Sequence, residues 1–242
     1  MHLSRALSFL VAGFVAASPA VAETVKGNGT PKSETRAVSG FMGVGVSVPG
    51  KVEVRLGPSE SVTVEADENI LPLIETVVRG SSLQIKPVRG NLNLDTRAIR
   101  VVVQARQVEQ LDIAGSASLA AEAIRSPRLK LRVAGSGSMD LRRLEADRVD
   151  LSIAGSGGLK LAGTARSLDG SIAGSGSLDA PALLVEEADV DIAGSGAAEM
   201  AVRKLLDVTV AGSGAVRYFG DPVVKRKILG SGVINRIGPL PQ

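Results

Sequence analysis

SIAGSG, at residues 152–157 and again at 171–176, belongs to a family of near-identical segments in this chain. The other copies are DIAGSA at 112–117, RVAGSG at 132–137, DIAGSG at 191–196, TVAGSG at 209–214 and KILGSG at 227–232. Their first glycines, which we call the corner glycines, recur every 18 to 20 residues and are Gly115, Gly135, Gly155, Gly174, Gly194, Gly212 and Gly230. A fixed period of this length indicates a repeat architecture, and it is too short for pairs of helices.

Residues on either side of the corners alternate between apolar and polar types. The residue two positions before each corner glycine is β-branched in every case: Ile113, Val133, Ile153, Ile172, Ile192, Val210 and Ile228. Apolar residues return four positions after each corner glycine: Leu119, Met139, Leu159, Leu178, Ala198, Val216 and Ile234. Strict alternation over short runs predicts strands with one buried and one solvent-exposed face.

Each repeat is therefore predicted to form a strand, a tight GSG corner, a second strand and a connection that leads back to the start of the next coil. Two strands alone cannot bury their apolar face, but successive repeats stacked in parallel build one continuous core. The predicted fold is all-β: a β-solenoid, similar to a β-helix, with coils of about 18–20 residues. Glycine at the corner supplies backbone angles that other residues adopt only with strain.

The GSG segments do not fit two familiar functional loops. No lysine follows them in the spacing of a phosphate-binding loop, and the G-x-S-x-G pattern of a serine nucleophile is absent. We expect a structural role, in which the serine hydroxyls hydrogen-bond along the stack or to the local turn. Those serines are Ser116, Ser136, Ser156, Ser175, Ser195, Ser213 and Ser231.

The first 22 residues, MHLSRALSFLVAGFVAASPAVA, predict a secretory signal peptide. A basic residue, Arg5, precedes an apolar run and the small residues Ala20-Val21-Ala22, after which cleavage is expected. No later run reaches the roughly 18 apolar residues of a membrane span, so we predict no transmembrane segment. The chain has no cysteine, hence no lipobox cysteine to carry a lipid. We expect a periplasmic or secreted protein.

The remaining chain is expected to form one domain. The predicted divisions are a flexible lead-in at 23–36, a single β-solenoid domain at 37–237 and a tail at 238–242. Within the domain, residues 37–110 are expected to be irregular N-terminal coils that act as a cap, and residues 111–237 are the regular GSG repeats. The prolines of the tail cannot donate to a strand ladder and should blunt the last edge.

Composition excludes several kinds of activity. The only histidine, His2, lies in the predicted signal peptide, and without histidine or cysteine there is no Ser-His-Asp or Cys-His catalysis and no imidazole or thiolate zinc site. Beyond the signal peptide the aromatic residues are Phe41, Tyr218 and Phe219, too few for a stacking platform. Charge is almost balanced, which predicts no nucleic-acid partner.

The stretch FMGVGVSVPGKVEVRLGPSESVTVEADENILPLIETVVRGSSLQI, followed by the IAGSG units, resembles a known family. It is similar to the family of putative auto-transporter adhesin head GIN domains, which are exported bacterial β-solenoids. The resemblance covers most of residues 37–237. It implies an envelope location and an adhesin-like role, and it implies no catalytic residues.

One polar column is unusual because four consecutive repeats place an aspartate at the same position. This acidic column comprises Asp150, Asp169, Asp189 and Asp207, with Lys130 before it and Lys225 after it. Stacked about 5 Å apart, the carboxylates would repel one another. They are the candidate metal ligands, since carboxylate oxygens suit Ca²⁺. The alternative is a solvated face, and no other cofactor is expected.

The predicted function is that of a non-enzymatic, adhesin-like binding or scaffold protein of the bacterial cell envelope. Its partner would be an unknown envelope protein, a glycan or a lipid; the basic segments at 125–132 and 223–227 could contact anionic lipid. The alternatives are a calcium-binding surface protein and a polysaccharide-active enzyme on a β-helix. In the enzyme alternative, Arg132 would be the basic residue, and the nearby Asp150 and Asp112 would be the acidic residues that act with it.

Overall fold

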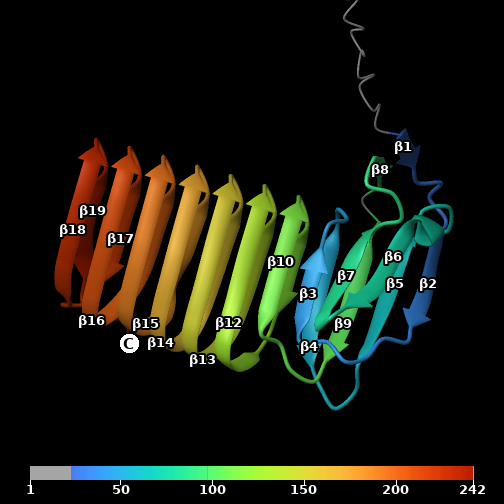
Figure 1. Ribbon diagram of the computed structural model, residues 1–242, viewed down its shortest axis with the longest axis horizontal. Helices are drawn as coiled ribbons and strands as arrows, with labels where there is room; N and C mark the ends of the chain where they lie inside the picture. Colours follow the sequence, from blue (N-terminus) through green and yellow to red (C-terminus); the bar gives the residue numbers. More distant parts are fainter. Residues whose placement is uncertain (1–22, 97, 242) are drawn as a thin grey trace, which may run out of the picture.

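A computed structural model describes residues 23–96 and 98–241, and from residue 110 onward they form a stack of coils (Figure 1). The strands of this stack are β10 (Gln110–Gly115), β11 (Ser118–Ala121), β12 (Ile124–Gly135), β13 (Ser138–Gly155), β14 (Gly158–Gly174), β15 (Ser177–Gly194), β16 (Ala197–Gly212), β17 (Ala215–Phe219), β18 (Val223–Gly230) and β19 (Val233–Gly238). The predicted β-solenoid is confirmed. The predicted signal peptide lies outside the described residues.

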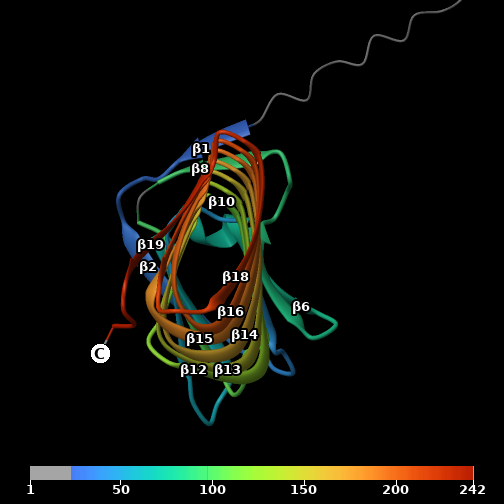
Figure 2. The ribbon, with the colours of Figure 1, turned by 90° about the vertical axis from the view of Figure 1, so that its left-hand side faces the viewer.

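Parallel pairing aligns residues one repeat apart, as the period predicts. Ile153 lies opposite Ile172, and Ile172 lies opposite Ile192. The corner glycines follow the same register, which aligns them along one edge of the stack. The strands β13 to β16 run without a break through the opposite edge, which we call the bend. Figure 2, viewed along the stack, shows the coils overlying one another.

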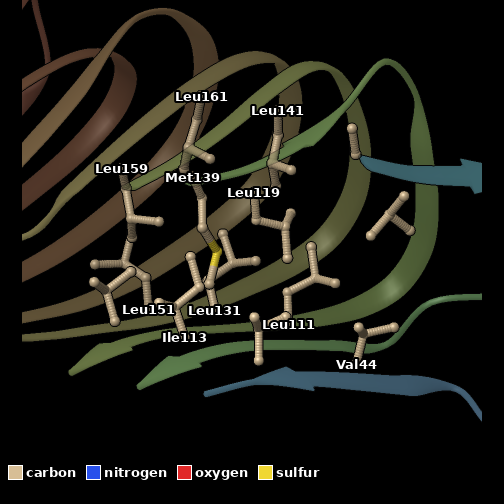
Figure 3. Packing of buried hydrophobic residues seen from close by; sticks show 14 of the residues in the cluster. Val44, Leu111, Ile113, Leu119, Leu131, Met139, Leu141, Leu151, Leu159 and Leu161 are labelled. Carbon is tan, nitrogen blue, oxygen red and sulfur yellow. The ribbon is translucent and has the colours of Figure 1, made fainter. Parts of the chain in front are cut away.

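The core is a set of apolar ladders inside the coils (Figure 3). One ladder contains Leu111, Leu131 and Leu151, and another contains Leu119, Met139 and Leu159. None of these six side chains exposes more than 4% of its surface. Because each coil covers the apolar edge of its neighbour, burial increases with every repeat and supplies the main stabilising free energy.

Both glycines of the GSG corner are required by the stacking. The corner glycines have φ between 111° and 128°, a region that favours glycine. The second glycine has ordinary backbone angles but little space: a Cβ on Gly157 would lie 2.4 Å from Cγ1 of Val133 in the preceding coil.

The corner serines differ from the prediction. Their backbone N–H groups donate across the stack, as from Ser156 to the carbonyl oxygen of Gly135 at 2.9 Å. No hydroxyl hydrogen bond is formed by a corner serine within the part of the chain that the structure describes. Hydroxyl ladders occur instead beside the corner, as between Ser138 and Ser118, whose Oγ atoms are 3.2 Å apart. The hydrogen bonds between the backbones of neighbouring coils already satisfy the polar groups of the corner. The hydroxyls of the corner serines therefore face solvent.

The N-terminal strands continue the stack, but their order in space differs from their order in the chain. They are β3 (Gly43–Val46), β4 (Lys51–Leu56), β7 (Ser82–Pro87) and β9 (Arg100–Ala105). Strand β3 pairs in parallel with β10 on one side and with β7 on the other, and β4 lies likewise between β11 and β9. The coil formed first in the chain therefore lies between two coils that follow it. The sequence analysis expected irregular coils in this region but did not predict this order.

Antiparallel strands close this end of the solenoid. Strand β5 (Ser61–Asp67) pairs with β9, and β2 (Pro31–Arg36) pairs with β5. Strand β6 (Ile74–Arg79) forms a hairpin with β7, and the 3₁₀ helix η1 (Leu71–Leu73) precedes β6.

The segment 23–36, expected to be a flexible lead-in, is largely strand. Besides β2 it contains β1 (Glu23–Lys26), which pairs in parallel with β8 (Leu92–Asp95). Its polar composition led to the wrong prediction, because an edge strand of a cap can be polar on both faces. At the other end β19 reaches Gly238, so the residues after it form the tail. Residues 23–96 and 98–241 contain no helix long and apolar enough to cross a membrane.

Candidate functional site

The acidic column exists as the repeat predicts. Asp150, Asp169, Asp189 and Asp207 pair in succession across β13 to β16, with Lys130 and Lys225 at the two ends. The four carboxylates therefore lie on consecutive coils of one outer face. Their environments differ along the column.

Arginines neutralise the first half of the column. The Arg148 guanidinium bridges two coils, with Nε 2.5 Å from Oδ1 of Asp150 and Nη2 3.0 Å from Oδ2 of Asp169. Arg128 adds a second contact to Asp150 at 2.7 Å. Partial burial works against ionisation of Asp150, but the hydrogen bonds from Arg148 and Arg128 outweigh it and hold its pKa below the ordinary value.

The second half of the column has no such partner. Within the described residues neither Asp189 nor Asp207 forms a salt bridge. Desolvation raises the pKa of Asp189, and the neighbouring carboxylates of Asp191, Asp207 and Asp169 raise it further. Unneutralised negative charge is thus concentrated around Asp189.

This charge does not form a coordination site on its own. Among the residues that the structure describes, no three or more His, Cys, Asp or Glu side chains are grouped so as to hold a metal ion. Each coil contributes one carboxylate to the acidic column, and Arg148 occupies two of the four. Calcium binding by the column therefore stays a prediction from the sequence.

Of the residues suggested for an enzyme, Arg132 is placed beside Asp112, whereas Asp150 is bound by other arginines. Arg132 lies between Asp112 and Ser152 in the strand register, while the salt bridges of Asp150 go to Arg128 and Arg148. Asp112 accepts a hydrogen bond from the side chain of Gln110 at 2.5 Å. Within the described residues Arg132 forms no salt bridge with either aspartate.

A shallow groove lies on the bend, and the repeat pattern did not predict it. It has a volume of about 950 Å³, and a smaller hollow adjoins it and shares part of its lining. We call the two together the arginine groove. Its charged lining residues are Arg106, Arg125, Arg143, Arg166, Arg203, Glu145, Asp147 and Glu186. Its apolar lining includes Leu56, Pro127, Ala146 and Leu184.

Every carboxylate of the groove is already paired. Arg125 contacts Glu145 at 2.7 Å, and Arg166 contacts Asp147 at 3.7 Å. A hydrogen bond from Lys204, 2.9 Å away, lowers the pKa of Glu186. The groove as a whole carries five arginines and three carboxylates.

Two arginines remain without an acidic partner. Arg106 donates from Nε to the carbonyl oxygen of Pro58 at 3.1 Å, and Arg203 has no salt bridge within the described part of the chain. Arg125 belongs to the basic segment 125–132 noted in the sequence. Arg106 and Arg203 lie outside any such segment, and only the coiling brings them to the same groove.

Comparison with protein families decides what kind of chain this is. Residues 40–222 match the family described as "Putative auto-transporter adhesin, head GIN domain". The chain belongs to this family. The resemblance seen in the sequence is therefore confirmed, and the match extends from the N-terminal cap to the penultimate coil of the head GIN domain.

Solved structures share the fold. A "putative adhesin" from Bacteroides fragilis has a TM-score of 0.83 at 18% identity and covers 88% of this chain and 100% of its own. A "putative lipid binding protein" from Parabacteroides distasonis has a TM-score of 0.76 at 24% identity, with 89% and 100% covered. A "putative adhesin" from Parabacteroides merdae has a TM-score of 0.70 at 23% identity, and again 89% of this chain and 100% of its own are covered. No curated protein matches the chain.

Proposed function

We propose that this protein is a non-enzymatic, adhesin-like binding protein of the cell envelope, and that its ligand is a linear acidic glycan held in the arginine groove. The observation that carries the proposal is the pair of arginines, Arg106 and Arg203, that remain without carboxylate partners in a groove crossing several coils. The predicted signal peptide and the family's description support export and a binding role.

The form of the groove favours an extended ligand. Its lining residues Arg125, Glu145, Thr164 and Leu184 follow one another in the strand register, each one coil further along. Neighbouring strands are about 4.8 Å apart, so this row spans roughly 14 Å. A groove that crosses several coils suits an extended polymer.

The chemistry of the groove favours carboxylate or sulfate groups. Arginine presents a planar fork of donors that binds such groups in a bidentate manner. The side chains of Arg125 and Arg166 expose 80% and 74% of their surface, so they can also reach a ligand. Without aromatic residues in the groove, stacking on sugar rings contributes nothing, and charge must provide most of the affinity.

Catalysis on the same ligand is not supported. The groove contains no histidine or cysteine, and each of its carboxylates is engaged by an arginine or lysine. The hydrogen bond from Lys204 lowers the pKa of Glu186, whereas a general acid requires a raised pKa. These residues support binding of the glycan without its cleavage.

The test is a titration of residues 23–242 with alginate, a linear polyuronate, and with a neutral glucan. We expect saturable binding of alginate that weakens as salt is added, and no binding of the glucan. The double variant Arg106→Gln, Arg203→Gln should bind about tenfold more weakly, since each lost charge-assisted contact removes roughly 1 kcal/mol or less at an exposed site.

Arg217→Gln is the matched control. Arg217 is exposed, is paired with Glu199 at 2.7 Å and does not line the groove, so this variant should bind as the wild type does. The proposal fails if alginate does not bind, or if the control weakens binding as much as the groove variant does.

A further inference from the structure

The last coil, formed by β18 and β19, differs from the coils before it because it exposes large apolar side chains. Eight large hydrophobic side chains are exposed in the described residues, and five of them are on this coil: Val223, Ile228, Leu229, Val233 and Ile237. Their exposed fractions run from 39% to 68%. We call this coil the C-terminal tip.

Loss of a covering neighbour explains the exposure of Ile228, which lies opposite the buried Val210, but it does not explain Leu229 and Val233. Leu229 and Val233 point outward, in columns where the preceding coil has Ala211 and Ala215. Earlier coils place alanine in the first column, and serine, glycine or alanine in the second. In these two outward columns, large apolar side chains therefore appear only on the last coil.

Positive charge is concentrated on the same coil. Lys225, Arg226 and Lys227 are exposed, and none of them forms a salt bridge within the described residues. Arg226 takes an inward column position, opposite Val208, where other coils place apolar residues. Arg236 likewise takes an inward column position, opposite Tyr218. Its Nε donates a hydrogen bond to the carbonyl oxygen of Gly220 at 2.5 Å. The open end of the core is thus lined by cations.

The charge disfavours a second copy of the chain as the occupant. Two tips placed end to end would bring three unpaired cations of each copy together, which is repulsive. Inward-pointing charges and lysines on an edge strand are also known to prevent strand pairing between molecules. The occupant must accept apolar side chains and supply negative charge over the same area.

We propose that the C-terminal tip binds the surface of an anionic lipid bilayer. The exposed Val223, Leu229 and Val233 would enter the boundary between headgroups and acyl chains, as the apolar face of an interfacial element does. Lys225 and Lys227 would contact anionic headgroups, which attract basic side chains near such a surface. The long axis of the solenoid would then stand away from the membrane. This proposal does not depend on the arginine groove.

Co-sedimentation with vesicles tests it. Residues 23–242 should bind phosphatidylcholine vesicles that contain phosphatidylglycerol, and bind pure phosphatidylcholine much more weakly. Lys225→Gln with Lys227→Gln should reduce the partition coefficient on anionic vesicles more than tenfold, as should Leu229→Ser with Val233→Ser. Circular dichroism and an unchanged midpoint of thermal unfolding would show that the variants are folded.

Two matched controls use similar residues elsewhere. Val88→Ser removes another exposed apolar side chain, and Lys51→Gln another exposed lysine; both should partition as the wild type does. Equal binding to neutral and anionic vesicles, no vesicle binding, or an equal loss in the controls would each overturn the proposal. A dimer in sedimentation velocity that Leu229→Ser with Val233→Ser abolishes would assign the tip to self-association instead.

Discussion

The first glycine of each GSG corner sets how closely neighbouring coils approach. At Gly155, φ is 113° and a Cβ atom would lie 2.6 Å from the carbonyl oxygen of Gly135. Gly115 has a similar φ of 115°, but a Cβ there would meet nothing within 4 Å. The two positions therefore separate backbone strain from steric contact between coils.

Alanine at these positions should destabilise the protein to different degrees. Gly115→Ala should cost about 1–3 kcal/mol through backbone strain alone. Gly155→Ala should cost at least about 1 kcal/mol more, because the methyl group forces adjacent coils apart. Denaturant unfolding followed by circular dichroism would measure both.

Gly57→Ala serves as the reference for this pair, because a Cβ on Gly57 meets nothing within 4 Å and its φ is not positive. It should change stability little. Equal losses in Gly115→Ala and Gly155→Ala would mean that the coils can separate without cost, contrary to the packing seen at the corner.

At the scale of the strand ladder, identical aspartates differ in their effect on stability because of the side chains beside them. Asp150 lies between Arg148 of its own strand and Arg128 of the preceding strand, whereas Asp189 lies among carboxylates. The sign of each contribution therefore depends on the side chains that the same strand and the adjacent strands supply.

Amide substitutions should reveal this difference. At neutral pH Asp189→Asn should stabilise the protein by about 0.5 kcal/mol through relief of repulsion, and Asp150→Asn should destabilise it by about as much through loss of ion pairs. Thermal unfolding across a pH series would measure both changes.

The pH dependence follows from the two pKa shifts. The folded-state pKa of Asp189 is raised, so its penalty is present above that pKa and disappears as the pH falls toward the unfolded value of 3.8. The folded-state pKa of Asp150 is lowered, so its stabilising contribution is present above 3.8 and is lost as the pH falls through the folded pKa. Shifts of the same sign for both variants at neutral pH would refute this account.

At the scale of the whole molecule, the two ends of the solenoid are closed differently. The N-terminal cap is sealed by β5, β2 and the buried carboxylate of Asp67, which is 5% exposed. Its two oxygens accept hydrogen bonds from the Gly29 N–H at 3.0 Å and from Oγ1 of Thr96 at 2.6 Å. One side chain thus joins the segment before β2, the end of β5 and the loop after β8.

Removal of this carboxylate should loosen the cap. Asp67→Ala leaves the Thr96 hydroxyl and the Gly29 N–H without their acceptor and should cost about 1–3 kcal/mol, the cost of one buried donor left unsatisfied, because Gly29 is exposed and its N–H can bond to water. Asp67→Asn keeps one acceptor oxygen and should cost less. Hydrogen exchange should show the loss of protection in β1, β2 and β8, with the GSG coils unaffected.

A uniform loss of protection along the chain would contradict this, because in a stacked repeat each coil depends mainly on its neighbours.

The sequence was most informative where the chain repeats. The period alone places Ile153, Ile172 and Ile192 next to one another, and it does the same for the aspartates of the acidic column. Because the period identifies each residue's neighbour, local alternation is enough to define a coil. The N-terminal region has no such period, and the position of β3 between β7 and β10 could not be read from it.

By itself, the sequence determined the all-β solenoid, its coil length, its glycine corners and the order of side chains in each column. Only the tertiary structure decided the strands in 23–36, the pairing of Arg148 with two aspartates and the meeting of Arg106 with Arg203 in one groove. Columns depend on a repeated distance along the chain, which sequence records directly. The groove, the cap and the ion pairs depend on contacts between non-equivalent positions, and those form only when side chains compete for partners in three dimensions.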